Sequence, residues 1–366
     1  MPLERKCRLG VLVLVLILIV GFHGVGGWGA VDSRPPVPTW VVPYFELPEK
    51  ADLCGEAVPL GSTDVRERFD REYTIVTMSH AQVYLWLKRA ERYFPWLEKQ
   101  LASRGLPDDL KYVAVAESDL MNSAVSHAGA AGPWQFMANT AVNYGITQSA
   151  AVDERYDFEK SAEAAFGYLK DLHDMFQNWT LAIAAYNCGE RRIQVEIGRQ
   201  KADSYYYLKL PQETERYVFR ILAIKEVLRN PVKYGYNLPK GAGYQPIIFE
   251  KVNIRLPSPM PILAAAEAAG ITYRELKVLN PCLISDVIPK GDFTVRVPEG
   301  RGKRFQKEVE VWKAASKPSF LIHKVSHGET LDSIALKYNS TKQQICSWNN
   351  LAGNKIRVGQ KLKIYQ

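Results

Sequence analysis

The C-terminal third of this chain contains an internal repeat, which limits what that part of the chain can fold into. Three residues of one segment match residues that lie 69 positions later in another: Thr272 and Thr341, Leu276 and Ile345, and Asn280 and Asn349. The flanking segments 288–297 and 356–364 share an apolar pattern as well. In each copy the spacing of apolar residues predicts a strand, two short helices and a second strand. We therefore expect two small α+β modules, at residues 246–298 and 320–366.

The segment before the repeat is predicted to be helical. Apolar residues recur at helical spacing, and we expect helices over the ranges 66–105, the stretch after Pro107, 161–176, 180–186 and 211–230. Pro, Gly and Tyr accumulate between residues 231 and 244, as is typical of a linker. The sequence therefore predicts an all-helical domain over residues 66–235, joined by a linker to the two modules.

The helix that begins near residue 108 carries a carboxylate on its apolar stripe. Leu110 and Glu117 lie on the same face, and Asp108 or Asp109 is placed to cap the first turn. A buried carboxyl either pairs with a cation or with backbone amides, or it raises its pKa and keeps a proton, as a general acid must. Asp119 cannot complete a two-carboxylate site, because two residues along a helix differ by about 200° of rotation. Glu117 is therefore a candidate acid that acts alone.

A run of small residues follows Glu117. Residues 123–137 include two glycines, which permit close approach of the backbone to a ligand and turns with positive φ. Trp134, Gln135 and Met137 add a stacking surface and an amide. Such a run is also typical of tight packing, so the pattern alone leaves binding and packing open.

The N-terminal residues predict export. Arg5, Lys6 and Arg8 precede an almost uninterrupted apolar run over residues 9–22, which is the pattern of a signal peptide. The same run could remain as a membrane anchor or form a buried core helix. We assign residues 1–30 to a signal peptide or membrane anchor. The Pro-rich residues 31–65 are expected to form a stiff, extended tether rather than a core element.

The chain is basic and lacks metal and redox motifs. A net charge of +8 and a pI near 9.0 favour an acidic partner: nucleic acid, an anionic membrane surface or an anionic wall polymer. Lys and Arg are dispersed rather than grouped with stacking aromatics, which together with export argues against nucleic acid. The cysteines lack C-x-x-C spacing, and His323 and His327 lack further ligands, so we expect no metal and no cofactor. Sequence leaves open which cysteines are oxidised among Cys54, Cys188, Cys282 and Cys346.

Several motifs occur in a fixed order along the helical segment: Glu117-Ser118, residues 129–136, residues 185–189 and residues 213–218. They resemble the motifs of the family 1 lytic transglycosylases. Residues 323–365 resemble a LysM peptidoglycan-binding module, and residues 246–298 resemble a diverged copy without its Gly-Glu-Thr-Leu opening. The resemblance implies a mainly α, goose-type-lysozyme-like catalytic domain followed by small βααβ LysM-like modules. It also implies cleavage of the β-1,4 bond between N-acetylmuramic acid and N-acetylglucosamine in peptidoglycan glycan strands, with 1,6-anhydro ends as product.

The resemblance carries roles only to matching residues. Glu117 is expected to be the single acid/base, which protonates the leaving oxygen and then takes the proton of the C6 hydroxyl. The positions that match the family's substrate groove are Ser126, Gln135, Met137, Tyr186, Asn187 and Glu213. From the residues alone, Tyr186 is equally compatible with a buried tyrosine, and Glu213 with a first-turn carboxylate favoured by the helix dipole.

Two residues depart from the family pattern, and one acidic segment is expected to be structural. Cys188 stands where a small residue is usual, which affects packing behind the neighbouring asparagine. Asp119 follows the Glu-Ser pair, and its charge is expected to raise the Glu117 pKa slightly. Asp153 and Asp157 are expected to pair with Arg155 or to cap the helix that follows.

These observations predict an exported wall-lytic enzyme of the periplasm or cell envelope, with inner-membrane association if the N-terminal segment is retained. Two alternatives remain on sequence grounds. One is a hydrolytic muramidase, which uses water and leaves reducing muramic acid ends. The other is an inactive wall-binding protein that uses only the repeats. Glu117, Tyr186 and Asn187 stand together in family register, which argues against an inactive protein.

Overall fold

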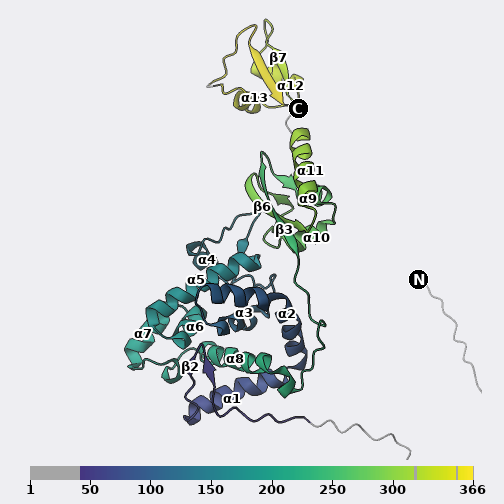
Figure 1. The fold of residues 1–366 in the computed structure, drawn as a ribbon. Helices are drawn as coiled ribbons and strands as arrows, with labels where there is room; N and C mark the ends of the chain where they lie inside the picture. The colour runs from purple at the N-terminus through teal and green to yellow at the C-terminus, as the bar shows by residue number, and fades with distance from the viewer. Residues whose placement is uncertain (1–41, 317–319, 352, 366) are drawn as a thin grey trace, which may run out of the picture. The chain divides into compact units, whose positions relative to one another are not determined.

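The computed structural model describes residues 42–316, 320–351 and 353–365 (Figure 1). The segment 1–30, expected to be a signal peptide or membrane anchor, lies outside the described residues. The elements below all belong to the unit Phe45–Gln366. None of the helices in the described ranges is both long and apolar enough to cross a membrane.

Residues 63–229 form a helical domain around two buried helices (Figure 1). Its α-helices are α1 (Thr63–Met78), α2 (His80–Ser103), α3 (Lys111–Ser118), α4 (Ala138–Asn143), α5 (Phe158–Phe176), α6 (Trp179–Cys188), α7 (Glu190–Gln200) and α8 (Gln212–Arg229). Most residues of α6 and α8 are buried: α6 is apolar on nearly all sides, whereas α8 buries an apolar face and also carries charged residues. Helix α8 packs against α1, α3 and α6. The helix that carries Glu117 is thus packed directly on a central helix.

The predicted helices are present with shifted ends. The range 66–105 is divided at Ser79 into α1 and α2. Helix α5 begins at Phe158, ahead of the predicted residue 161, because Asp157 caps it by accepting a hydrogen bond from the Lys160 amide (3.1 Å). The predicted helices do not include α7, whose apolar stripe is short: Ile193 is buried and Ile197 packs half-buried against the core.

Asp108 and Asp109 do not cap α3, contrary to the prediction. A 3-10 turn, Asp108–Leu110, precedes the helix, and neither start has a side-chain cap hydrogen bond. Asp108 instead pairs with Lys111 (2.6 Å), and Asp109 accepts a hydrogen bond from the buried Lys225 ammonium (2.8 Å). A buried ammonium is costly without an anion, so Asp109 stabilises the core rather than the helix end.

The described part of the predicted tether packs against the helical domain. Leu47, Leu53 and Leu60 are buried in its core, and β1 (Asp52–Leu53) pairs antiparallel with β2 (Glu56–Ala57). The prediction of an extended tether over residues 31–65 is therefore wrong for residues 47–60. The prolines there separate apolar residues whose partners lie far along the chain, and local composition does not reveal those partners.

The two repeats form two modules of the same strand, helix, helix, strand order (Figure 1). The first contains β3 (Phe249–Leu256), β4 (Met260–Pro261), α9 (Ile262–Ala269), α10 (Tyr273–Leu279), β5 (Val287–Ile288), β6 (Gly291–Pro298) and α11 (Gly302–Ala315). The second contains β7 (Phe320–Lys324), α12 (Leu331–Lys337), α13 (Lys342–Trp348) and β8 (Lys361–Tyr365). Strand β3 pairs antiparallel with β6, β4 with β5, and β7 with β8, and each module has its own core. The predicted fold class, a mainly α domain followed by small α+β modules, is confirmed.

The residues matched in the repeat occupy equivalent structural positions. Thr272 and Thr341 each cap the second helix of their module in a capping box. Asn280 hydrogen-bonds both backbone groups of one residue in β6 (2.8 Å each), and Asn349 does the same in β8 (2.7 and 2.8 Å). The asparagine amide thus ties the second helix to the last strand, which explains why this residue recurs.

Candidate active site

Glu117 lies in the last turn of α3 and is held by a tyrosine of α8. The Tyr217 hydroxyl donates a hydrogen bond to Glu117 Oε1. Among the residues that the structure describes, the carboxyl thus takes its hydrogen bond from a neutral phenol rather than an ion pair from an arginine. Part of the Glu117 side chain remains exposed, so the carboxyl is held by the core and still reachable from outside.

The Glu117 carboxyl holds a proton more tightly than an ordinary glutamate does. Burial raises its pKa from 4.5 to about 7, and the negative charge of Glu213 adds to this rise. The Tyr217 hydrogen bond and the positive charge of Arg220 act in the opposite direction. Near neutral pH the group is therefore close to half protonated, as suits one carboxyl that both gives and takes a proton.

Arg220 is occupied by two other carboxylates. It pairs with Glu213 (2.9 Å) and with the buried Glu72 (3.6 Å), and Arg216 pairs with Glu72 as well (2.7 Å). Because these carboxylates bind the guanidinium, its attraction for Glu117 acts over a distance and leaves the raised pKa in place.

The loop over residues 124–136 is fixed beside Glu117 by hydrogen bonds from two helices. Ser118 of α3 donates to the Pro133 carbonyl (2.8 Å), and Tyr186 of α6 donates to the Trp134 carbonyl (2.7 Å). Trp134 is fully buried. Burial, together with the charge of Glu117, raises the Tyr186 pKa well above its usual range. Tyr217 thus contacts Glu117 directly, and Tyr186 holds the loop that follows it.

The other predicted site residues lie around this centre with defined partners. Gln135 has a positive φ of 48° and donates to the Gly132 carbonyl (2.8 Å), and Ser126 accepts from the Ala130 amide (3.0 Å). Asn187 accepts a hydrogen bond from the Thr214 hydroxyl (2.8 Å). Met137 is exposed. Contact of these residues and of Glu213 with a substrate stays a prediction.

One expectation about a single residue is wrong, and one question that the sequence left open is answered. Asp119 ends α3 with φ 58° and accepts a hydrogen bond from the Trp86 indole (2.7 Å). It is not among the groups that shift the Glu117 pKa, so the expected like-charge effect of Asp119 is wrong. Cys54, Cys188, Cys282 and Cys346 are free thiols.

Tyr217 contacts Glu117 but is not among the site residues predicted from the sequence. It lies one helical turn after Glu213 and therefore on the same face of α8. The motif at 213–218 includes it, but the spacing does not say which member reaches Glu117. That contact joins residues 100 positions apart.

No group of three or more His, Cys, Asp and Glu side chains in the described part of the chain is placed to hold a metal ion. His323 instead contacts Glu329 (2.8 Å) and the Tyr338 hydroxyl (3.1 Å), so it stabilises the second module.

Three segments match known domain families. Residues 94–208 match the Transglycosylase SLT domain, residues 249–311 match the Lytic transglycosylase MltD, LysM-like domain, and residues 323–364 match the LysM domain. The segment that matches the transglycosylase SLT domain thus includes Glu117, and two segments that match LysM-type domains follow it. The resemblance drawn from the sequence motifs is confirmed.

The chain is also similar to longer proteins. It is 32% identical over 292 residues to Membrane-bound lytic murein transglycosylase D of Escherichia coli strain K12, which covers 75% of this chain and 64% of that relative. It is 37% identical over 119 residues to the putative tributyltin chloride resistance protein of Alteromonas sp. strain M-1, covering 32% of this chain and 58% of that protein. The solved 70 kDa soluble lytic transglycosylase of Escherichia coli matches 46% of this chain and 29% of its own, with 22% identity and a TM-score of 0.36.

Proposed function

We propose that this protein is a peptidoglycan lytic transglycosylase, which cleaves the β-1,4 bond between N-acetylmuramic acid and N-acetylglucosamine and leaves 1,6-anhydro ends. The observation that carries the proposal is the state of Glu117. Burial raises its pKa to about 7, and the Tyr217 phenol orients the carboxyl. A carboxyl in this state can protonate a leaving oxygen near neutral pH. The domain matches and the similarity to a lytic murein transglycosylase support the same class of reaction.

The reaction needs one carboxyl in two successive roles. Glu117 first gives its proton to the glycosidic oxygen while the bond from that oxygen to C1 of N-acetylmuramic acid breaks. The C6 hydroxyl oxygen of the same sugar then bonds to C1, and its proton passes to the Glu117 carboxylate. The products are a 1,6-anhydro end and a free 4-hydroxyl on the leaving strand, and Glu117 is protonated again.

The neighbours of Glu117 favour this route over hydrolysis. Tyr217 donates its hydrogen bond to the carboxylate that exists between the two proton transfers. Glu213 is paired with Arg220 (2.9 Å), so its carboxylate is engaged by a guanidinium rather than free to hold an attacking water. We further propose that Ser126, Gln135, Met137, Tyr186, Asn187 and Glu213 contact the glycan strand.

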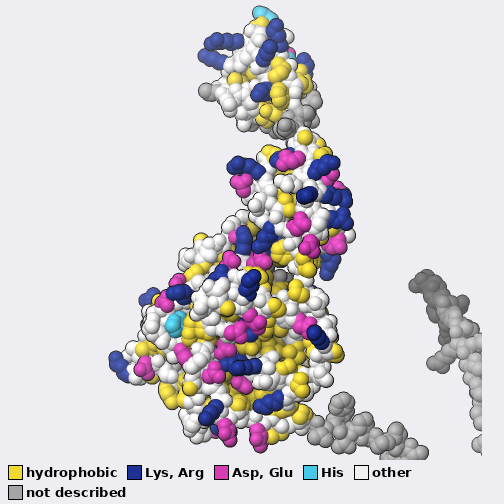
Figure 2. All heavy atoms as spheres, in the orientation of Figure 1, with side chains coloured by type: hydrophobic (Ala, Val, Ile, Leu, Met, Phe, Trp, Pro, Cys, Tyr) yellow, Lys and Arg dark blue, Asp and Glu magenta, His cyan; other side chains and the backbone are white. Residues whose placement is uncertain are grey.

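We assign retention on the wall to the terminal LysM domain. Residues 320–365 contain seven Lys or Arg against two Asp or Glu, a net charge of +5 out of the +8 of the whole chain, so most of the net charge lies in this domain. Figure 2 shows Lys and Arg side chains on its surface. An excess of positive charge favours binding to an anionic wall polymer.

We also propose that the protein is exported to the cell envelope through its basic and apolar N-terminal residues. N-terminal sequencing of the protein recovered from envelope fractions distinguishes a cleaved signal peptide from a retained membrane anchor.

The reaction is tested by the mass of the sugar ends released from purified peptidoglycan. We expect 1,6-anhydro ends. Reducing muramic acid ends would instead identify a hydrolytic muramidase, and no released sugar at all would identify a wall-binding protein without activity.

A further inference from the structure

The first LysM-like module contacts the helical domain through backbone hydrogen bonds and through a side chain buried in the core of the module. The backbone of Val152 pairs with that of Leu283 in an antiparallel bridge, flanked by hydrogen bonds from Asp153 N to Cys282 O (2.8 Å) and from Ile284 N to Ala151 O (3.0 Å). The Val152 side chain is buried in the core of the module rather than in the core of its own domain. The module thus completes the packing of the segment 149–157, which belongs to the helical domain.

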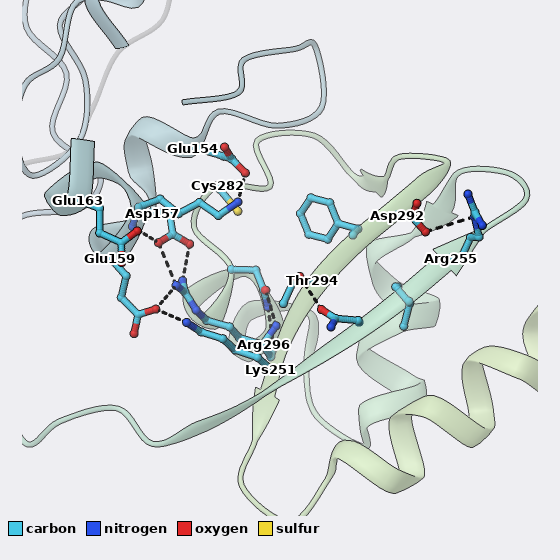
Figure 3. Close-up of a pocket in the computed structure, with 15 residues that line it drawn as sticks. Glu154, Asp157, Glu159, Glu163, Lys251, Arg255, Cys282, Asp292, Thr294 and Arg296 are labelled. Carbon is cyan, nitrogen blue, oxygen red and sulfur yellow. Dashed lines mark hydrogen bonds and ion pairs between the residues drawn. The ribbon is translucent and has the colours of Figure 1, made fainter. Parts of the chain in front are cut away.

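A buried charge cluster joins the same two parts (Figure 3). Arg296 of β6 forms two contacts with the Asp157 carboxylate (2.6 and 2.9 Å) and one with Glu159 (3.0 Å), and Lys251 of β3 pairs with Glu159 (2.6 Å). The side chains of Asp157 and Arg296 are both largely buried. Removing one member of such a pair leaves an unpaired buried charge, so this contact resists separation.

The segment 149–157, which the module contacts, contains Arg155, and this residue binds the active-site loop at two points. Arg155 Nη1 donates to the carbonyls of Gly129 (2.9 Å) and Phe136 (3.0 Å), which are the two ends of the loop beside Glu117. The guanidinium is oriented by Asp153, which accepts from Arg155 Nη2 at 2.7 Å and from Arg155 Nε at 3.0 Å. Asp153 is the residue whose backbone amide is bound by the module.

We propose that the module at residues 249–311 is a structural part of the active site, with Arg155 as the positioning residue between them. The module holds Val152, Asp153 and Asp157, these residues fix Arg155, and Arg155 holds the loop 129–136 over Glu117. The expected effect of the module on turnover rests on the proposed transglycosylase function. Its expected effect on the order of the loop does not. The first module then positions the active-site loop, and the terminal domain binds the wall.

The ordering of the loop is tested by amide hydrogen exchange in the full chain. In Arg296→Ala and Arg155→Ala we expect amides of residues 126–136 to exchange at least about tenfold faster than in wild type, because their restraint is lost. Asp157→Asn keeps an amide that can cap α5 but removes the charge that pairs with Arg296, so it should have the same effect without loss of the helix. Arg255→Ala is the matched control. Arg255 lies in the same module but is exposed and pairs with Asp292, so exchange in the loop should not change.

Turnover of soluble glycan strands gives the second measurement. In Arg296→Ala and Asp157→Asn we expect kcat to fall by about 10- to 100-fold with a smaller change in KM, because the reacting groups are misplaced rather than the substrate lost. Arg155→Lys, which keeps the charge but not the two-carbonyl contact, should lie between wild type and Arg155→Ala.

The outcomes separate the two claims. Faster exchange in the loop, with wild-type melting of the rest of the domain, supports the proposal even if no wall-degrading activity is found. The proposal is wrong if Arg296→Ala and Asp157→Asn speed exchange at residues 151–153 and 282–284 and leave residues 126–136 as protected as in wild type. It is equally wrong if the loop is loosened and kcat stays at the wild-type value in an active enzyme.

Discussion

At the scale of single residues, Glu117 differs from an ordinary glutamate because burial raises its pKa to about 7 and a tyrosine hydroxyl binds its carboxyl. Its position on an apolar stripe is visible in the sequence, and from it the raised pKa could be predicted. Its partner could not be predicted, because Tyr217 is distant in the chain and only the packing of α8 on α3 brings the two together. Glu72, which also binds Arg220, could not be predicted for the same reason, whereas Glu213 lies on the same helix as Arg220.

The pKa of Glu117 predicts how activity varies with pH. The first step needs the protonated carboxyl, so kcat should fall by about tenfold per pH unit above about 7. The Tyr217 hydrogen bond lowers this pKa, so Tyr217→Phe should move the alkaline limb of the profile to higher pH. Tyr207→Phe, which changes an exposed tyrosine, is the control. A limb that moves to lower pH in Tyr217→Phe would contradict this assignment.

The same group predicts a pH-dependent difference in stability. In the folded chain the pKa is raised to about 7, above the ordinary 4.5, so the stability it contributes is present below pH 4.5 and is lost as pH rises to 7. Glu117→Gln cannot lose a proton there. Its free energy of unfolding should therefore rise relative to wild type by up to about 3 kcal/mol between pH 4 and pH 8. Urea unfolding of both proteins at the two pH values measures this, and a difference that is constant with pH would refute it.

At the scale of elements, the sequence is informative where a pattern is local and repeated. The capping threonines and the strand-binding asparagines could be predicted as a repeat because each acts within its own module. The prediction of an extended tether is wrong for the segment 47–60. Its prolines are visible in the local sequence, whereas the core residues that contact Leu53 lie far along the chain. The loop 124–136 could be predicted only in part. Its glycines indicate turns and close packing, but the sequence does not show which residues pack against them.

Gly132 is required by the packing of this loop. A Cβ at Gly132 would lie 1.8 Å from the Arg155 carbonyl oxygen, whereas a Cβ at Gly129 would have no atom within 4 Å. Both residues have positive φ, 80° and 84° respectively, so alanine costs about 1 kcal/mol at either for conformation alone. Gly132→Ala should destabilise the protein by about 1–3 kcal/mol more than Gly129→Ala does, because the backbone must move. Thermal melting of the two variants measures the difference, and equal melting temperatures would contradict the packing described.

At the scale of the whole molecule, we propose different roles for the two LysM-type domains despite their common topology: the first positions the active-site loop, and the second binds the wall. The first shares its core with the helical domain through Val152 and Arg296, whereas the second carries the excess of positive charge. The contact between Arg296 and Asp157 joins residues 139 positions apart, so no sequence pattern could predict it. The sequence does reveal that the first copy is diverged, in keeping with a separate role.

Two truncations distinguish these tasks. A chain that ends at Ser316 keeps the first module with α11, so it should turn over soluble glycan strands like the full chain and bind insoluble wall more weakly. A chain that ends at Gln245 exposes Val152 and leaves Asp157 without Arg296, so its helical domain should melt at lower temperature and turn over more slowly. Wall retention that is unchanged by the first truncation, or a wild-type melting temperature after the second, would contradict this division.

The claim on which the proposed function depends is that Glu117 alone supplies the proton. The most direct measurement is the release of soluble sugar from purified peptidoglycan by wild type, by Glu117→Gln, and by Glu163→Gln as a control at an exposed glutamate. We predict that Glu117→Gln remains folded and releases no anhydro sugar above background, while Glu163→Gln matches wild type. Release of anhydro ends by Glu117→Gln at the wild-type rate would contradict the account.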